Sequence, residues 1–471
     1  MIKENGMSPN NYDLAVIGGG EAGIAAAAQG SESGARICLI EKSPQLGGAC
    51  VATGTLPSKT LSISAGMLEL VKKMKNFGIR IEGSFALDFK EVLASRLRVT
   101  RCDLGVIQSH LRSHGVEVIQ GRANFLTKNQ ILVERDGGGT VEIESPRVIL
   151  AMGSQPVVIP SLPTNGRTIL STDDIVLLKD LPSQMLIVGA GVIGCEYAMI
   201  FQTFGTQVVL IEKLEHALPG QDKDIVLLVE KELKRRGIRF LPETTLTGHA
   251  ETPEGRLLVT TDGGEQLATE KAVICVGRNP ATGGLNLKTI GIEVGKRGEI
   301  LVNRRLQTTV PGVFAAGDVL GLRMLSSTAI LEGMVAAENA LGGDREPDER
   351  FIPSGILTQP EIGSVGLTEQ EAAAQGIPYA AGKCSYAGLV KACSLYSHSP
   401  GLIKLIIDRD SHRLIGAHII GAEAAEIIHQ MALALRLGAK AEDFVYAIYN
   451  HPSISEGFRE AAREALKNAK T

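Results

Sequence analysis

The chain has 471 residues but no tryptophan, and phenylalanine and tyrosine together account for only 4% of it. Such a scarcity argues against the aromatic platforms on which proteins stack single-stranded nucleic acid. The 48 basic and 52 acidic side chains nearly balance, so no positively charged surface for nucleic acid is indicated. No uninterrupted apolar run reaches the roughly 18 residues of a membrane span. We therefore expect neither nucleic-acid binding nor membrane insertion.

Cysteine pairs are also missing, because the seven cysteines are odd in number and none forms a Cys-x-x-Cys motif. This excludes a disulfide scaffold and disfavours a zinc site, and we expect no metal ligands. Residues 1–11 are polar and lack the apolar stretch of a signal peptide, so we expect a cytoplasmic location. The densest basic run, residues 231–236, predicts a solvated helix face.

Glycine, by contrast, is abundant, with 54 residues. An apolar strand at residues 13–17 leads into a turn with Gly18, Gly20 and Gly23, then an alanine-rich helix and a second strand that ends at Glu41. Glycines at this spacing allow a tight turn, close approach of a pyrophosphate and close helix packing, with the phosphates at the helix N-terminus. A terminal carboxylate binds ribose hydroxyls. The segment predicts a dinucleotide site.

The same pattern recurs about one domain length later, with Gly189, Gly191 and Gly194 between two apolar strands. The second of these strands ends at Glu212. A carboxylate that binds a 2′-hydroxyl repels a 2′-phosphate, so Glu212 predicts a preference for NADH over NADPH, which the neighbouring Lys213 would soften. The chain is thus predicted to be an α/β protein with two Rossmann-like domains.

The last 120 or so residues follow a different pattern. Apolar runs at 402–407 and 414–420 are joined by a polar turn, which predicts an antiparallel hairpin. Helices are expected at about 424–437 and after Ser455. These features predict a C-terminal α+β domain.

Four further motifs resemble sequence motifs of a known enzyme family. Residues 47–59 read GGACVATGTLPSK, and with the two glycine turns they resemble the pyridine nucleotide-disulphide oxidoreductases. Residues 313–318 resemble the second flavin motif of that family, and residues 352–368 resemble the opening of its dimerisation domain. Residues 451–456 resemble its His-Pro…Glu signature. The similarity covers essentially the whole chain.

The resemblance implies that the first turn binds FAD, that the second binds NAD(H) and possibly NADP(H), and that the C-terminal domain forms a homodimer. It predicts an FAD domain in two parts, 1–152 and 279–350, an NAD(P) domain at 153–278 and a dimerisation domain at 351–471. The implied cofactor-binding residues are Gly18, Gly20, Gly23, Glu41, Lys42, Gly48, Thr55, Lys59, Gly153, Gly189, Gly191, Gly194, Glu212, Gly277, Gly317 and Asp318.

The catalytic residues implied by the resemblance are Cys50, Lys59, Glu196, His451 and Glu456. Lys59 and Glu196 match a family ion pair beside the flavin, where a cation stabilises negative charge on the reduced ring. His451 and Glu456 match an acid–base pair that one subunit contributes to the site of the other.

One position departs from the disulfide reductases, which carry Cys-x4-Cys where this chain has Cys50 and Thr55. A hydroxyl forms no disulfide, so electrons are expected to leave the flavin directly. The family member with threonine here is the soluble pyridine nucleotide transhydrogenase, which makes a transhydrogenase-like enzyme the leading hypothesis. Glu212 and the retained His451 and Glu456 count against it.

Three alternatives therefore stay open. The first is an NADH-dependent reductase of a quinone or another small acceptor. The second is a dihydrolipoyl dehydrogenase-like enzyme that uses Cys50 and His451. The third is a non-catalytic flavoprotein partner or redox sensor.

Overall fold

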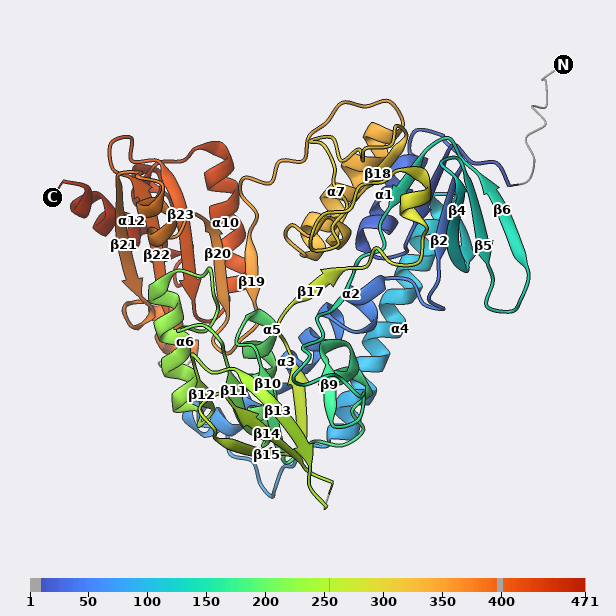
Figure 1. Cartoon of the computed structure of the whole chain (residues 1–471). Coiled ribbons are helices and arrows are strands. Elements are labelled where there is room, and N and C mark those ends of the chain that lie inside the picture. Colours follow the sequence, from blue (N-terminus) through green and yellow to red (C-terminus); the bar gives the residue numbers. More distant parts are fainter. Residues whose placement is uncertain (1–9, 254, 396–400, 471) are drawn as a thin grey trace.

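The computed structural model describes residues 10–253, 255–395 and 401–470. The prediction that residues 1–11 form no signal peptide falls mostly on residues 1–9, which lie outside the described residues. Within the described chain, three five-stranded sheets organise the molecule (Figure 1). The core on one face of the second sheet also includes Ile356, Ile362 and Ile420 of the third sheet.

The first sheet is entirely parallel and follows the first glycine turn. Its strands are, in spatial order, β18 (Val313–Ala315), β7 (Val148–Leu150), β1 (Leu14–Ile17), β2 (Ile37–Glu41) and β3 (Glu117–Gln120). Helices α1 (Glu21–Ser31) and α7 (Ser326–Ala340) pack against it and each other. An antiparallel sheet of β4 (Arg122–Thr127), β5 (Gln130–Glu134) and β6 (Thr140–Glu144) shares its apolar core. Every residue of β1 is buried, as expected for a strand covered on both faces.

The second sheet is also parallel and follows the second glycine turn. Its strands are β12 (Arg239–Leu241), β11 (Gln207–Ile211), β10 (Gln184–Val188), β16 (Lys271–Ile274) and β9 (Ile169–Ser171). Met185 and Ile187 of β10 pack with α5 (Val192–Phe204) and α6 (Lys223–Arg235), whereas Leu186 and Val188 face the opposite core. That core includes β13 (Leu246–Glu251), β14 (Leu257–Thr261) and β15 (Gln266–Thr269).

Two short strands join the first sheet to the second. β8 (Ser154–Pro156) and β17 (Arg278–Pro280) pair antiparallel, and they lie next to the two predicted boundaries of the NAD(P) domain, 152/153 and 278/279. The predicted boundaries of the three domains stay a prediction.

The third sheet is antiparallel and forms the C-terminal domain (Figure 1). Its strands are β19 (Ser354–Ile356), β20 (Ile362–Gly366), β23 (Leu414–Ile420), β22 (Leu402–Asp408) and β21 (Tyr379–Ser385). Its helices are α8 (Glu369–Ala374), α9 (Val390–Leu395), α10 (Ala424–Leu437), α11 (Ala441–Tyr446) and α12 (Glu456–Ala469). The predicted hairpin is present as β22 and β23, and the two predicted helices as α10 and α12.

Three helices lie between β2 and β3 in sequence: α2 (Gly48–Ala52), α3 (Thr55–Lys73) and α4 (Phe89–Ser113). The remaining turns of helix are η1 (Met74–Phe77), η2 (Thr172–Leu177), η3 (Leu287–Ile290), η4 (Asp318–Leu320) and η5 (Tyr386–Gly388). Across the described residues, we find no helix with both the length and the apolar character that crossing a membrane requires.

The prediction of a solvated face at residues 231–236 is wrong for Arg236. Its side chain is only 5% exposed and forms ion pairs with Glu69 of α3 and Glu232 of α6. Arg236 also donates to the carbonyl of Gln359 in the C-terminal domain, 2.9 Å away. The C-terminal end of α6 is therefore packed between two other parts of the chain.

Candidate active site

The first glycine turn leaves no room for side chains at two of its positions. Gly18 has φ +107°, and a Cβ there would lie 2.2 Å from the carbonyl oxygen of Ala151. A Cβ at Gly23 would lie 1.8 Å from the carbonyl oxygen of Gly18. Gly20 is the N-cap residue of α1, and among the described residues no side chain there bonds to the first turn of the helix. The N–H groups of this turn are therefore available to an anion.

Glu41, at the end of β2, is fixed beside this turn. One carboxylate oxygen accepts from the N–H of Gly19 at 2.6 Å, and the other accepts from the N–H of Ser43 at 2.6 Å. The side chain is buried, while the neighbouring Lys42 is exposed. The carboxylate is thereby held in one orientation before a ribose binds.

The start of α2 lies against the same turn. The N–H of Gly47 donates to the carbonyl of Gly19 at 2.7 Å. Gly48 has φ +55°, and a Cβ there would lie 2.9 Å from Cα of Gly20. This contact places α2, which carries Cys50, next to the start of α1.

Gly317 and Glu332 lie beside the first glycine turn, since Gly317 follows β18 and a Cβ at this position would be 3.0 Å from Cβ of Ala22 in α1. The N–H of Gly317 donates to the carboxylate of Glu332 at 2.6 Å. Burial, with a contribution from the neighbouring Glu349 carboxyl, raises the pKa of Glu332 to about 8. Sequence reasoning missed Glu332, whose only signal is a carboxylate inside the apolar stretch 329–337 of α7.

Asp318 belongs to a hydrogen-bonded chain that sequence reasoning also missed. Its carboxylate accepts from the hydroxyl of Ser154 at 2.5 Å, and that hydroxyl accepts from Arg278 at 2.8 Å. Arg278 also pairs with Asp173 at 2.7 Å. Ser154 and Arg278 follow Gly153 and Gly277, respectively, so these two predicted cofactor-binding glycines border the hydrogen-bonded residues.

The second glycine turn repeats the geometry of the first. Gly189 has φ +100°, and a Cβ at Gly194 would lie 1.8 Å from the carbonyl oxygen of Gly189. Gly191 caps α5, and a Cβ at this position would have open space around it among the described residues. Like α1, α5 thus presents free N–H groups at its start.

Glu212 reproduces the arrangement of Glu41. Its carboxylate accepts from the N–H of Ala190 at 2.7 Å and from the N–H of Leu214 at 3.0 Å. The side chain is buried and the neighbouring Lys213 is exposed. A fixed carboxylate at this point is suited to a ribose diol and repels a 2′-phosphate.

Lys59 and Glu196 meet although 137 residues separate them. Nζ of Lys59 lies 2.5 Å from Oε1 of Glu196. The same oxygen accepts from the N–H of Leu357, in the C-terminal domain, at 2.8 Å. The pair therefore joins α3, α5 and the loop after β19.

His451 and Glu456 form the second predicted pair. Nδ1 of His451 lies 2.9 Å from the carboxylate of Glu456, which also accepts from the N–H of Ser453 at 2.9 Å. The Ser453 N–H and the imidazole lower the pKa of Glu456. The segment that carries the pair lies in the C-terminal domain, apart from α2 (Figure 1), so one chain alone does not bring His451 to Cys50.

Cys50 has hydroxyls and a carboxylate as neighbours. Its thiol interacts with the side chains of Ser326, Glu21 and Thr55, and burial raises its pKa to about 11. All seven cysteines lie within the described residues and all are free. Thr55 thus places a hydroxyl, and not a second thiol, among the neighbours of Cys50.

Comparison with known proteins decides the family. Residues 12–333 match the family described as pyridine nucleotide-disulphide oxidoreductase. The chain belongs to this family. Residues 352–462 match the dimerisation domain of the pyridine nucleotide-disulphide oxidoreductases.

Members of the family are similar to this chain over nearly the whole length of both proteins. Dihydrolipoyl dehydrogenase of Thermus scotoductus is 34% identical over 462 residues, which cover 97% of this chain and 98% of that protein. Dihydrolipoyl dehydrogenase of Bacillus subtilis is 32% identical over 449 residues, 95% of this chain and 97% of that protein. The crystal structure of LpdA from Mycobacterium tuberculosis superposes with a TM-score of 0.89 at 28% identity, covering 96% and 99% of the two chains.

FAD and NAD(H) are the cofactors of the pyridine nucleotide-disulphide oxidoreductases, and the two turns fit them. A Cβ at Gly18, Gly23 or Gly194 would collide with neighbouring backbone atoms, so these positions accept only glycine. Each turn leads into a helix N-terminus. Glu41 and Glu212 hold preset carboxylates where a ribose diol would bind. These features are what a dinucleotide requires of its site.

The raised pKa of Cys50 makes this thiol slow to react. Since the thiolate is the nucleophile, a pKa of about 11 in place of 9.0 lowers the reactive fraction at pH 8 by about 100-fold. We expect alkylation of Cys50 by iodoacetamide to be slow at pH 8 and to accelerate steadily toward pH 10. Peptide mass spectrometry measures this, with the exposed Cys102 of α4 as an internal reference. Cys50 labelling as fast as Cys102 at pH 8 would contradict the assignment.

Proposed function

We propose that this enzyme takes two electrons and a proton from NADH and passes them directly to a small acceptor, a second nicotinamide nucleotide in transhydrogenase-like turnover. The single observation that carries the proposal is the hydroxyl of Thr55 beside Cys50, in a chain whose seven cysteines are all free. A hydroxyl neither forms a disulfide nor supplies a thiolate, so a dithiol relay has no second sulfur.

Bound FAD would supply the redox chemistry, since it accepts a hydride from one nicotinamide and gives two electrons to an acceptor. Lys59 would hold a positive charge next to the reduced flavin, where it stabilises developing negative charge. Glu196 orients the ammonium at 2.5 Å, and the N–H of Leu357 orients Glu196 in turn. The side chain of Glu196 is 4% exposed, so the pair has little freedom to rearrange.

NADH is the proposed electron donor. The carboxylate of Glu212 is buried and takes two backbone hydrogen bonds, so it cannot turn away from a 2′-phosphate without losing both. An NADP(H) preference would require a cation in its place. We infer that NADPH is the poorer substrate.

We propose that the enzyme acts as a homodimer in which each subunit contributes His451 to the site of the other. The C-terminal domain matches the dimerisation domain of the family. Close to His451, Ile448 and Tyr446 expose 99% and 84% of their surface, which is unusual for apolar side chains that stay in water. A second copy covering this region would bury them.

A specific observation favours a second candidate, a dihydrolipoyl dehydrogenase-like reaction through Cys50. The His451–Glu456 pair is intact at 2.9 Å, and a reaction without a thiol leaves it no proton to transfer. Two relatives that are 32% and 34% identical are named dihydrolipoyl dehydrogenase. Reduction of a quinone at the flavin is a variant of the first proposal with another acceptor.

Stopped-flow spectroscopy distinguishes these candidates. The flavin-loaded enzyme is reduced with one equivalent of NADH and mixed with thio-NAD⁺, a quinone or lipoamide. We expect rapid return of the oxidised flavin spectrum with the nicotinamide analogue. Reoxidation no faster than in buffer would refute direct transfer to a nicotinamide. Reoxidation by lipoamide that disappears in Cys50→Ser would favour the second candidate, and no bleaching by NADH at all would indicate a non-catalytic flavoprotein.

A further inference from the structure

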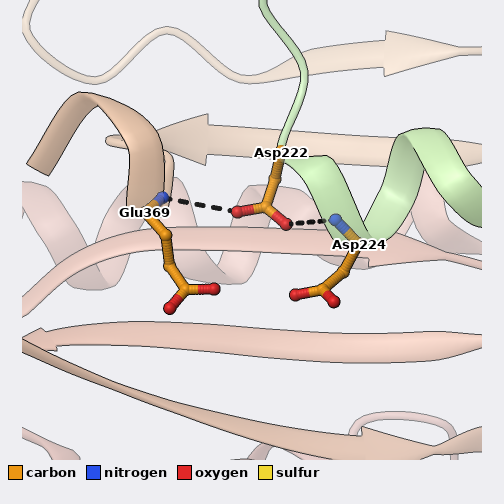
Figure 2. Close-up of side chains that lie close together, drawn as sticks. All are labelled: Asp222, Asp224 and Glu369. Carbon is orange, nitrogen blue, oxygen red and sulfur yellow. Dashed lines mark hydrogen bonds between the residues drawn. The ribbon is translucent and has the colours of Figure 1, made fainter. Parts of the chain in front are cut away.

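Lys404 of β22 is a wholly buried lysine surrounded by three carboxylates. Its Nζ lies 2.7 and 2.8 Å from the two oxygens of Asp222 and 2.5 Å from Asp224, and it also pairs with Glu369. Figure 2 shows the three carboxylates, which are close enough together to hold a metal ion. The ammonium group already bonds to all three, so the arrangement is an ion-pair cluster.

Asp222 is the centre of this cluster. Its side chain is 0% exposed and caps α6, since it accepts from the N–H of Asp224 at 3.1 Å. It also accepts from the N–H of Glu369, at the start of α8, at 3.4 Å (Figure 2). Two helix starts and one ammonium therefore fix a single carboxylate. Without Lys404 this carboxylate would be buried and short of positive charge, which is strongly unfavourable.

The segment that ends at Asp222 also holds the second glycine turn. It begins at Glu212, which accepts the N–H of Ala190 at 2.7 Å. Further along, the N–H of Leu218 donates to the carbonyl of the same Ala190 at 2.8 Å. Both backbone groups of Ala190, in the middle of the turn, are thus bonded to one segment.

Leu218 makes this bond from a strained conformation. It has φ +49° and is 1% exposed. A leucine in the left-handed region persists only where its surroundings hold it there. Leu218 is four residues from Asp222, so the cluster fixes the nearer end of the strained segment.

We propose that Lys404 is a positioning residue for the NAD(H) site, supplied by the C-terminal domain. By holding Asp222 it keeps Leu218 bonded to Ala190 and so maintains the shape of the turn that receives the pyrophosphate. This inference rests on that turn binding NAD(H), as proposed above, and is independent of which acceptor takes the electrons.

Binding of ADP-ribose tests the proposal, because this probe carries the pyrophosphate and no redox chemistry. Calorimetry on the flavin-loaded enzyme is expected to show binding about ten-fold weaker in Lys404→Met than in the wild type, with the KM for NADH raised similarly. The kcat and flavin content are expected to stay within about two-fold. Lys404→Arg should restore most of the affinity. The matched control is Lys383→Met, since Lys383 is 42% exposed and pairs only with Asp224 among the described carboxylates.

Asp222→Asn keeps the test decisive if Lys404→Met fails to fold, because the amide oxygen can still accept from the start of α6 while the charge that pairs with Lys404 is removed. We expect ADP-ribose to bind about three-fold more weakly, and the N–H of Leu218 to exchange with solvent faster while that of Val259 in β14 is unchanged. Wild-type binding and wild-type exchange at Leu218 in a folded variant would overturn the proposal. So would an equal loss in Lys383→Met. A wild-type enzyme that does not bind ADP-ribose would instead contradict the assignment of the turn itself.

Discussion

Replacement of Lys59 by methionine is expected to slow reduction of the flavin by NADH by about 10²–10³-fold. Methionine keeps the length and apolar stem of the side chain but removes the ammonium that pairs with Glu196 at 2.5 Å. The reduced flavin would then lose the fixed positive charge that Lys59 is proposed to hold beside it. Single-turnover absorbance measurements after mixing with NADH give the rate, and flavin content is measured on the same preparation.

Lys72→Met is the matched control for this experiment. Lys72 lies on the same helix and also reaches α5, where Nζ donates to the carbonyl of Thr203 at 3.1 Å. We expect the control to reduce flavin within about two-fold of the wild-type rate. An equal fall in both variants would show that contact between α3 and α5, rather than charge, sets the rate. A wild-type rate in Lys59→Met would exclude Lys59 from hydride transfer.

Replacement of Thr55 by cysteine is expected to create a disulfide with Cys50 and NADH-dependent reduction of lipoamide, which the wild-type enzyme would lack. The thiol of Cys50 already interacts with the hydroxyl of Thr55, so a sulfur at position 55 would lie within reach. The new thiol would also restore the pair through which the disulfide reductases of the family are implied to work. Thiol titration of the denatured protein, with and without prior reduction, counts the disulfide, and a lipoamide assay measures the activity.

The control is Thr53→Cys, at the C-terminal end of α2, which adds a thiol two residues earlier. It is expected to remain free and to confer no lipoamide reduction. Thr55→Cys with every thiol free after air oxidation would show that the two side chains cannot approach. Efficient lipoamide reduction by the wild type would contradict the proposal that electrons leave the flavin directly.

Much of the nucleotide-binding architecture was predictable, because it depends on neighbours in sequence. Gly18 and Gly23 are five residues apart, and the constraint between them is a contact within one turn. The same is true of Gly189 and Gly194. Local apolar patterns likewise located the strands around each turn to within one or two residues. The pairing of Lys59 with Glu196 was expected from the resemblance alone, and the structure places the two atoms in contact.

The buried charges were not predictable in this way. Lys404 lies in an apolar run that predicts a strand and gives no sign of a partner. In the structure its ammonium group pairs with Asp222, which lies 182 residues earlier in the chain. Arg236 belongs to a run that suggested solvent exposure, but α6 packs against both α3 and the C-terminal domain. A charged side chain is buried only where distant segments supply its partners, and sequence spacing carries no information about those segments.

By itself, then, the sequence determined the two glycine turns, their terminal glutamates and the hydroxyl at position 55. Each of these features depends either on the identity of one residue or on contacts between residues that are close together in the sequence. Only the tertiary structure decided that the C-terminal domain reaches the NAD(H) region through Lys404, and that His451 of one chain is remote from Cys50 of the same chain. Those relations depend on how segments far apart in the sequence pack together, which no local pattern encodes.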